Sequence, residues 1–286
     1  MDDGKRRKKS RSTIDTVLLV GSYIVLALVV IFTAYPLLWM VFGSFKSMSA
    51  FYTNIWGPPK TIVWENYRDA WRVGGIGRYF VNSVIVTTLT LLLVLTFSSL
   101  AAYSFAKMRF PGRDVLFYFL LASMMMPTGI IAIPIFEVVY KLGILNTRAS
   151  MVLVYSASGM AFGTFILRAF FLAIPRELEE AALLDGATPF RAFWQIILPL
   201  SKPALATLMI FTGMGTWNEY FLGSILVRSA DLRTLPLGLV AFVSEHSTNY
   251  PQYFAALTII TIPIIVLYIA CQRQFLSGLT AGAVKG

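Results

Sequence analysis

The chain has 286 residues, of which 57% are hydrophobic and only 13% are charged. Soluble domains carry about one quarter charged residues, so this composition indicates a protein embedded in lipid. The net charge of +10 would suggest nucleic acid in a soluble protein, but here membrane orientation explains it. A single cysteine, Cys271, excludes a disulfide framework, and a single histidine, His246, argues against a histidine metal centre or a Ser/His triad.

Six long apolar stretches predict membrane spans, since a span needs roughly 20 mostly apolar residues. They cover residues 17–43, 79–106, 115–136, 149–167, 203–227 and 254–272. Glu219 is the one charged residue within them. The predicted organisation is a basic tail at 1–16, one membrane domain at 17–272 and a C-terminal tail at 273–286.

Lysine and arginine counts predict the orientation of these spans. The segments on the side of the two termini carry 15 of them, against 9 on the opposite side. Because cytoplasmic loops are enriched in these residues, both tails and the loop at 168–202 are predicted to be cytoplasmic. The opposite loop at 44–78 is rich in tryptophan and tyrosine, which suits either an interfacial belt or a protein contact outside the cell.

The loop between the fourth and fifth spans carries two helix signatures in succession. Pro175 suits a first turn, the glutamates after it complement the helix dipole, and Gly186 suits the left-handed position after the helix. Thr188 and Pro189 predict the cap and first residue of a second helix, which Pro199 is expected to end.

Each of these two helices has a predicted apolar face. The faces consist of Ile174, Leu178, Ala181 and Ala182, and of Phe190, Phe193, Trp194 and Ile197. A helix that rests on lipid favours Lys and Arg, yet residues 175–198 carry four acids and two bases. The loop is therefore predicted to bind protein rather than the lipid surface.

The same loop carries a recognisable motif. Glu180-Ala181-Ala182, Asp185-Gly186-Ala187 and Ile196-Ile197-Leu198-Pro199 resemble, element by element, the EAA motif of binding-protein-dependent ABC importer permeases. Other stretches are similar to the second membrane subunit of maltose and multiple-sugar importers, and the resemblance covers nearly the whole chain from Tyr35. They lie at 36–39, 101–106, 110–112, 217–220 and 278–286.

The resemblance implies an all-α membrane protein of the type I ABC importer kind, with six transmembrane helices and a cytoplasmic coupling-helix loop between spans four and five. In this family that loop docks on a cytoplasmic ATPase. The residues expected to form the contact are Glu180, Ala181, Ala182, Asp185, Gly186, Ala187 and Pro199. The alanines permit close approach, and Glu180 can pair with a basic group of the partner.

The chain has no Gly-x-x-x-x-Gly-Lys-[Ser/Thr] phosphate loop, so ATP and Mg²⁺ are expected on the partner ATPase. No cofactor, metal or catalytic residue is expected in this chain. The resemblance implies a bacterial or archaeal inner-membrane complex with a second permease (a heterodimer), two ATPase subunits and an extracytoplasmic solute-binding protein. Its expected cargo is a sugar or oligosaccharide.

Two groups of residues remain open to two interpretations. Trp217, Asn218, Glu219 and Tyr220 offer the aromatic and polar groups that bind sugars, and an acid within a span predicts function, but these residues could instead hold the helices together. In the glycine-rich C-terminal tail, Gly278, Thr280 and Gly282 either contact the ATPase, as the resemblance implies, or form a flexible end.

Two other transport functions compete with sugar import. One is an ABC permease for a different solute, such as a polyamine or phosphate. The other is a secondary transporter, which should show buried charge pairs and inverted repeats. The single intramembrane acid and the absence of a visible repeat argue against the secondary transporter.

Overall fold

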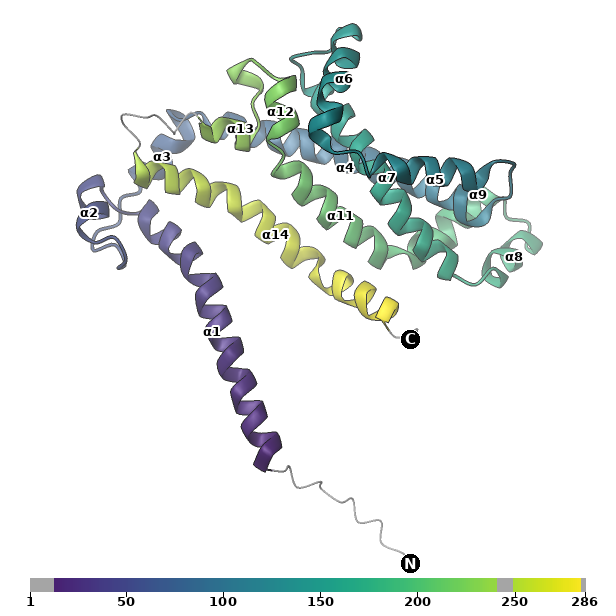
Figure 1. Cartoon of the computed structure of the whole chain (residues 1–286), viewed down its shortest axis with the longest axis horizontal. Coiled ribbons are helices and arrows are strands. Elements are labelled where there is room, and N and C mark those ends of the chain that lie inside the picture. Colours follow the sequence, from purple (N-terminus) through teal and green to yellow (C-terminus); the bar gives the residue numbers. More distant parts are fainter. Residues whose placement is uncertain (1–12, 241–248, 284–286) are drawn as a thin grey trace, which may run out of the picture. The chain divides into compact units, whose positions relative to one another are not determined.

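The structure is a computed structural model that describes residues 13–240 and 249–283, with side chains for 16–240 and 249–272. Within these ranges every regular element is helical (Figure 1). The α-helices are α1 Thr13–Ser44, α2 Met48–Thr53, α3 Glu65–Arg72, α4 Ile76–Lys107, α5 Arg113–Ser123, α6 Thr128–Lys141, α7 Arg148–Ala173, α8 Glu177–Leu184, α9 Pro189–Ala192, α10 Leu198–Leu200, α11 Lys202–Trp217, α12 Phe221–Leu226, α13 Leu235–Leu239 and α14 Tyr250–Ala283. A π-helical turn, η1 Phe193–Ile197, joins α9 to α10, and a 3-10 turn, η2 Ala230–Leu232, precedes α13.

Four helices, α1, α4, α7 and α14, are each long and apolar enough to cross a membrane. Two further stretches qualify as bent pairs: α5 with α6, bent by 103°, and Pro189–Leu200 with α11, bent by 75°. Counting each pair as one span gives six, the number predicted from the sequence.

The third predicted span, 115–136, is not one helix as expected. The helix stops at Ser123 and restarts at Thr128, after Pro127 with an extended ψ of 130°. Proline has no N–H to donate and disfavours the helical conformation in the residue before it, so the chain turns here.

The fifth predicted span, 203–227, is also wrong as a single helix. The backbone leaves the helix after Trp217 and re-enters at Phe221. The three residues between are Asn218, Glu219 and Tyr220, so the one acid of the predicted span lies at a helix break, where its carboxylate can bond to freed backbone groups.

The chain divides into two compact units. Of the described residues, the first contains 13–67 and 249–258 and the second 68–240 and 259–283. In the first unit, the rings of Trp39, Phe51 and Phe254 pack together, and the Trp39 indole N–H donates to the Ile55 carbonyl at 2.8 Å. Part of the aromatic loop at 44–78 is thus a packed cluster rather than only an interfacial belt.

Lys46 holds the loop of this first unit. Its side chain is buried, and its ammonium donates to the carbonyl oxygens of Asn54 and Ile55, the latter at 3.1 Å. Burial lowers the pKa of Lys46 below its ordinary value. The ammonium thus satisfies two carbonyl groups where α2 ends, at a cost in desolvation.

In the second unit, α4 and α7 form the most extensive helix pair, and α11 packs against both. Small residues allow the close approach: a Cβ on Gly163 of α7 would lie 2.9 Å from the Ser98 Cβ of α4. Toward Ala106 and Ile174 this packing continues into a buried cluster that includes Tyr103, Leu167, Phe171, Phe193 and Ile197. The loop between α7 and α11 is therefore anchored in the same core as the spans.

Candidate functional site

The loop between α7 and α11 folds largely as predicted. Helix α8 ends at Leu184, and Gly186 takes the left-handed conformation with φ of +83°. Thr188 caps α9, its hydroxyl accepting from the Arg191 N–H at 3.2 Å, and Pro189 is the first helical residue. These features depend on local backbone chemistry, which is why the sequence predicts them.

The other two prolines of this loop do not take the positions that the sequence predicts. Pro175 precedes α8 rather than standing in its first turn, because the helix begins at Glu177. Pro199 does not end the second helix but lies within α10, after the π-helical turn η1, in which the Leu198 N–H bonds to the Phe193 carbonyl. The wider π turn relieves the clash between a proline ring and the carbonyl four residues earlier, so the chain stays helical to Leu200.

The EAA-motif residues that are expected to contact the ATPase lie at or near the surface. Glu180, Ala181, Asp185, Gly186 and Pro199 are exposed, and Ala182 and Ala187 are half-buried.

The two apolar faces are divided between the core and the surface, which the sequence did not predict. Ile174, Phe193 and Ile197 are buried, whereas Leu178, Leu184, Phe190 and Trp194 are exposed, Leu184 by 89% and Phe190 by 63%. The loop is thus fixed to the spans on one side and presents leucine and aromatic side chains on the other. Such an exposed patch beside small residues is typical of a protein-binding surface.

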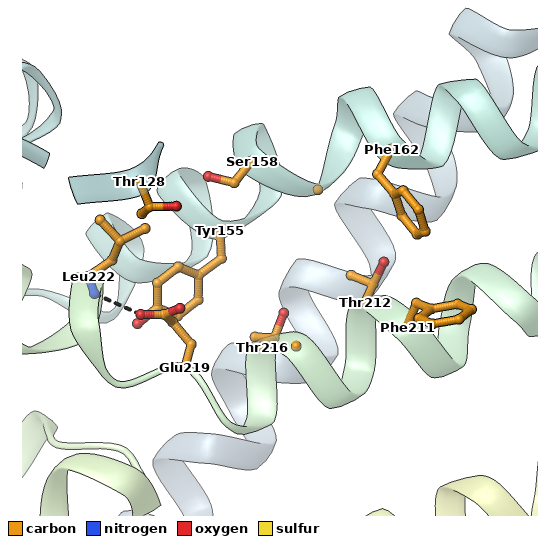
Figure 2. A pocket seen from close by; sticks show the side chains of 11 residues that line it. Thr128, Tyr155, Ser158, Phe162, Phe211, Thr212, Thr216, Glu219 and Leu222 are labelled. Atoms are coloured by element: carbon orange, nitrogen blue, oxygen red, sulfur yellow. Dashed lines mark hydrogen bonds between the residues drawn. The ribbon is translucent and has the colours of Figure 1, made fainter. Parts of the chain in front are cut away.

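A second candidate site is a cavity of about 350 Å³ among α6, α7, α11 and α12 (Figure 2). Its polar lining is mostly hydroxyl groups, and two phenylalanine rings and two glycines complete the wall. The lining residues are Thr128, Tyr155, Ser158, Gly159, Phe162, Phe211, Thr212, Gly215, Thr216, Glu219 and Leu222. Hydroxyls and aromatic faces beside one carboxylate suit a neutral, hydroxyl-rich solute.

Glu219 has a structural contact within this cavity. Its Oε1 accepts from the Leu222 N–H at 2.7 Å and so satisfies the first turn of α12 (Figure 2). The other carboxylate oxygen has no hydrogen bond described. Nearby, the buried hydroxyl of Tyr155 has no hydrogen-bond partner in the described part of the chain. The free carboxylate oxygen of Glu219 is thus available to a solute in the cavity.

The neighbours of Glu219 in the predicted pathway lie outside the lining. Trp217 is buried, its indole N–H donates to the Ile260 carbonyl at 3.1 Å, and its ring meets Phe80 edge to face. The Asn218 amide donates to the Met214 carbonyl at 2.9 Å, and Tyr220 is exposed. Trp217 and Asn218 therefore hold the helices together, which was the alternative interpretation of these residues. Of the four residues, only Glu219 lines the cavity.

The hydroxyl groups of the cavity are not among the site residues predicted from the sequence. The signal was their spacing: Thr212, Thr216 and Glu219 fall on one face of a helical period, as do Tyr155, Ser158 and Phe162 on α7. Hydroxyl groups are common in membrane helices, where they often bond to their own backbone, so the spacing is a weak signal alone.

The C-terminal residues assigned to a tail continue α14 instead. The helix runs to Ala283, so the backbone at Gly278, Thr280 and Gly282 is helical, and the boundary at 273 is no helix end. Their side chains, like His246, lie outside the described residues.

Residues 94–280 match the family described as "Binding-protein-dependent transport system inner membrane component". The chain belongs to this family. It is 35% identical to the diacetylchitobiose uptake system permease protein NgcG of Streptomyces coelicolor, over 87% of this chain and 83% of that protein. It is 32% identical to the arabinooligosaccharides transport system permease protein AraQ of Halalkalibacterium halodurans, over 98% of this chain and 100% of that one.

The fold agrees with a solved structure of a bacterial ABC transporter involved in alginate import. The TM-score is 0.83 at 24% identity, over 92% of this chain and 98% of that chain. The predicted all-α permease fold of the type I importers is confirmed, as is the assignment to the ABC importer permeases. The chain is an inner-membrane transport component.

Proposed function

We propose that the chain is a permease subunit of an ATP-driven importer for a sugar or oligosaccharide. The observation that carries this is the cavity of hydroxyls, two phenylalanine rings and Glu219. The two relatives named for oligosaccharides support it. The cargo would pass from a solute-binding protein outside the membrane into the cytoplasm by alternating access.

The lining of the cavity argues against the other cargoes. A phosphate would require a cation or several N–H donors, and no lining residue is basic. A polyamine would require several carboxylates, and Glu219 is the one acid in the lining. Neutral hydroxyl groups match the many hydroxyls of a sugar, each of which must exchange its water for a partner.

The proposed assembly contains a second permease, so that the two form a heterodimer, and two ATPase subunits that bind ATP and Mg²⁺. No cofactor or metal is assigned to this chain itself. The sequence has no phosphate loop. The loop between α7 and α11, which contains α8 and α9 and is called the α8–α9 loop below, has an exposed apolar side. Both observations support a separate ATPase. The distribution of Lys and Arg supports cytoplasmic termini.

The test is reconstitution of the full complex in proteoliposomes, with ATP hydrolysis measured for binding protein loaded with a panel of sugars. We expect stimulation by one class of oligosaccharide and by neither spermidine nor phosphate. If spermidine or phosphate stimulated ATP hydrolysis, that solute and not a sugar would be the cargo.

Glu219→Gln tests the cavity. Glutamine keeps the oxygen that accepts from the Leu222 N–H but removes the charge, so assembly should be unchanged. A hydrogen bond to a charged group is worth about 1.5–3 kcal/mol and one to a neutral group about 0.5–1.5 kcal/mol. The difference of about 1–1.5 kcal/mol should raise the KM for transport about five- to tenfold.

The control for this experiment is Glu137→Gln, an exposed acid on α6 outside the cavity. A wild-type KM in Glu219→Gln would mean that Glu219 has only a structural role, through its bond to the Leu222 N–H.

A further inference from the structure

The hydroxyl of Tyr103, on α4, lies where both helices of the α8–α9 loop meet the membrane domain. It donates to the Glu179 carboxylate of α8 and lies 3.2 Å from the Pro189 carbonyl oxygen of α9. One side chain of a spanning helix therefore contacts both helices that flank Gly186. Nothing in the family match or the named relatives assigns a role to it.

The Tyr103 side chain is tightly packed within the membrane domain. It is only 6% exposed, and its ring packs on Phe193 with centroids 5.0 Å apart. One turn further along α4, the Lys107 ammonium donates to the Ile174 carbonyl at 2.8 Å, where α7 ends. The hydroxyl thus projects from a well-packed position, so its place relative to α4 varies little.

By contrast, α8 has little else to fix it. No residue of α8 is buried. Glu179 provides the one hydrogen bond described between an α8 side chain and α4, and the Lys107 ammonium of α4 also attracts the carboxylates of Glu179 and Glu177. Glu179 directly precedes Glu180 of the EAA motif, and a hydrogen bond to a carboxylate is among the stronger kinds. The hydrogen bond from Tyr103 is therefore the most directional contact described between α8 and α4.

We infer that Tyr103 is the positioning residue that transmits movement of the EAA loop to the second span, through its contact with Glu179 and Pro189. The inference rests on the proposed function, in which α8 contacts an ATPase. Without the hydroxyl, α8 and α9 could change their angle at Gly186 while α4 stays in place, so ATP would be hydrolysed without transport.

The first measurement is the amount of sugar transported per ATP hydrolysed by the complete transporter in proteoliposomes. We expect Tyr103→Phe and Glu179→Ala each to lower this ratio about tenfold, the factor expected for a lost bond to a charged group. The double variant should be no worse than either single one, since both remove the same bond. Glu179→Gln keeps an acceptor oxygen and should restore most of the ratio.

The matched control is Tyr140→Phe on α6, which removes an equivalent hydroxyl from a side chain 67% exposed. An unchanged ratio in Tyr103→Phe would overturn the inference. A second contrary result is a smaller amount of assembled complex that still transports as much sugar per ATP as the wild type. The hydroxyl would then contribute to stability alone, and the inference would be overturned. A wild-type complex without sugar-dependent ATP hydrolysis would instead overturn the proposed function.

A second measurement does not depend on transport. Hydrogen exchange of the full chain, purified with the subunits that accompany it, should be faster across 177–184 in Tyr103→Phe than in the wild type, with α4 unchanged. Equal exchange rates across α8 in the two proteins would overturn the inference whatever the cargo.

Discussion

Replacing Glu180 by lysine is expected to abolish ATP hydrolysis stimulated by the sugar-loaded binding protein, while the chain still inserts and assembles. Glu180 is exposed in the first turn of α8, and no hydrogen bond or ion pair of its side chain is described, so replacing that side chain removes no described contact within the chain. In the proposed complex it faces the ATPase. Reversing one member of a charge pair across an interface costs about 2–5 kcal/mol, which is more than tenfold in coupling.

The control for this prediction is Glu177→Lys. Glu177 is also exposed and also stands in the first turn of α8, so both variants disturb the helix dipole alike, by roughly 0.3–1 kcal/mol. Only Glu180 belongs to the EAA motif. Measured ATPase stimulation should fall in Glu180→Lys and stay near wild type in Glu177→Lys. Equal stimulation in the two variants would remove Glu180 from the coupling contact.

The parts of the loop that the sequence predicts depend on neighbouring residues. The left-handed Gly186 and the Thr188 cap follow from the conformational freedom of glycine and from a hydroxyl within reach of a free N–H. The position of Pro199 inside a helix was not predicted. A helix can accommodate proline by widening one turn, and whether it does so depends on what packs against it.

The surroundings of Tyr103 and Tyr155 could not be predicted in the same way. Tyr103 and Glu179 are separated by 76 positions in the sequence, and only the packing of α4 against the loop brings them together. Tyr155 lines a cavity together with Glu219, which lies in the break between α11 and α12, and the long apolar run at 203–227 conceals that break. Hydropathy detects spans well but not the interruptions that create sites within them.

Gly163→Val is expected to prevent normal packing of three helices. A Cβ at this position would lie 2.5 Å from the Ser98 Oγ of α4 and 3.0 Å from the Leu208 Cδ2 of α11. Both neighbours are fully buried, and the Ser98 hydroxyl donates to the Met160 carbonyl at 3.2 Å, so neither can move aside easily. We expect the free energy of unfolding to fall by about 1–3 kcal/mol or more, measured as a lower thermal unfolding midpoint in detergent.

The matched control for Gly163→Val is Gly21→Val on α1, since a Cβ there meets no atom within 4 Å. Both substitutions add the same β-branched side chain to a spanning helix, so any difference reflects packing and not helix propensity. Equal midpoints would mean that α4 and α7 do not meet closely at Gly163. Gly163→Ala should also lower the unfolding midpoint, because its Cβ meets the Oγ and Cβ atoms of Ser98. Adding Ser98→Gly removes both of these atoms and should recover part of that decrease. The reason is that close packing of the two backbones, rather than the Ser98 hydroxyl, holds these helices together.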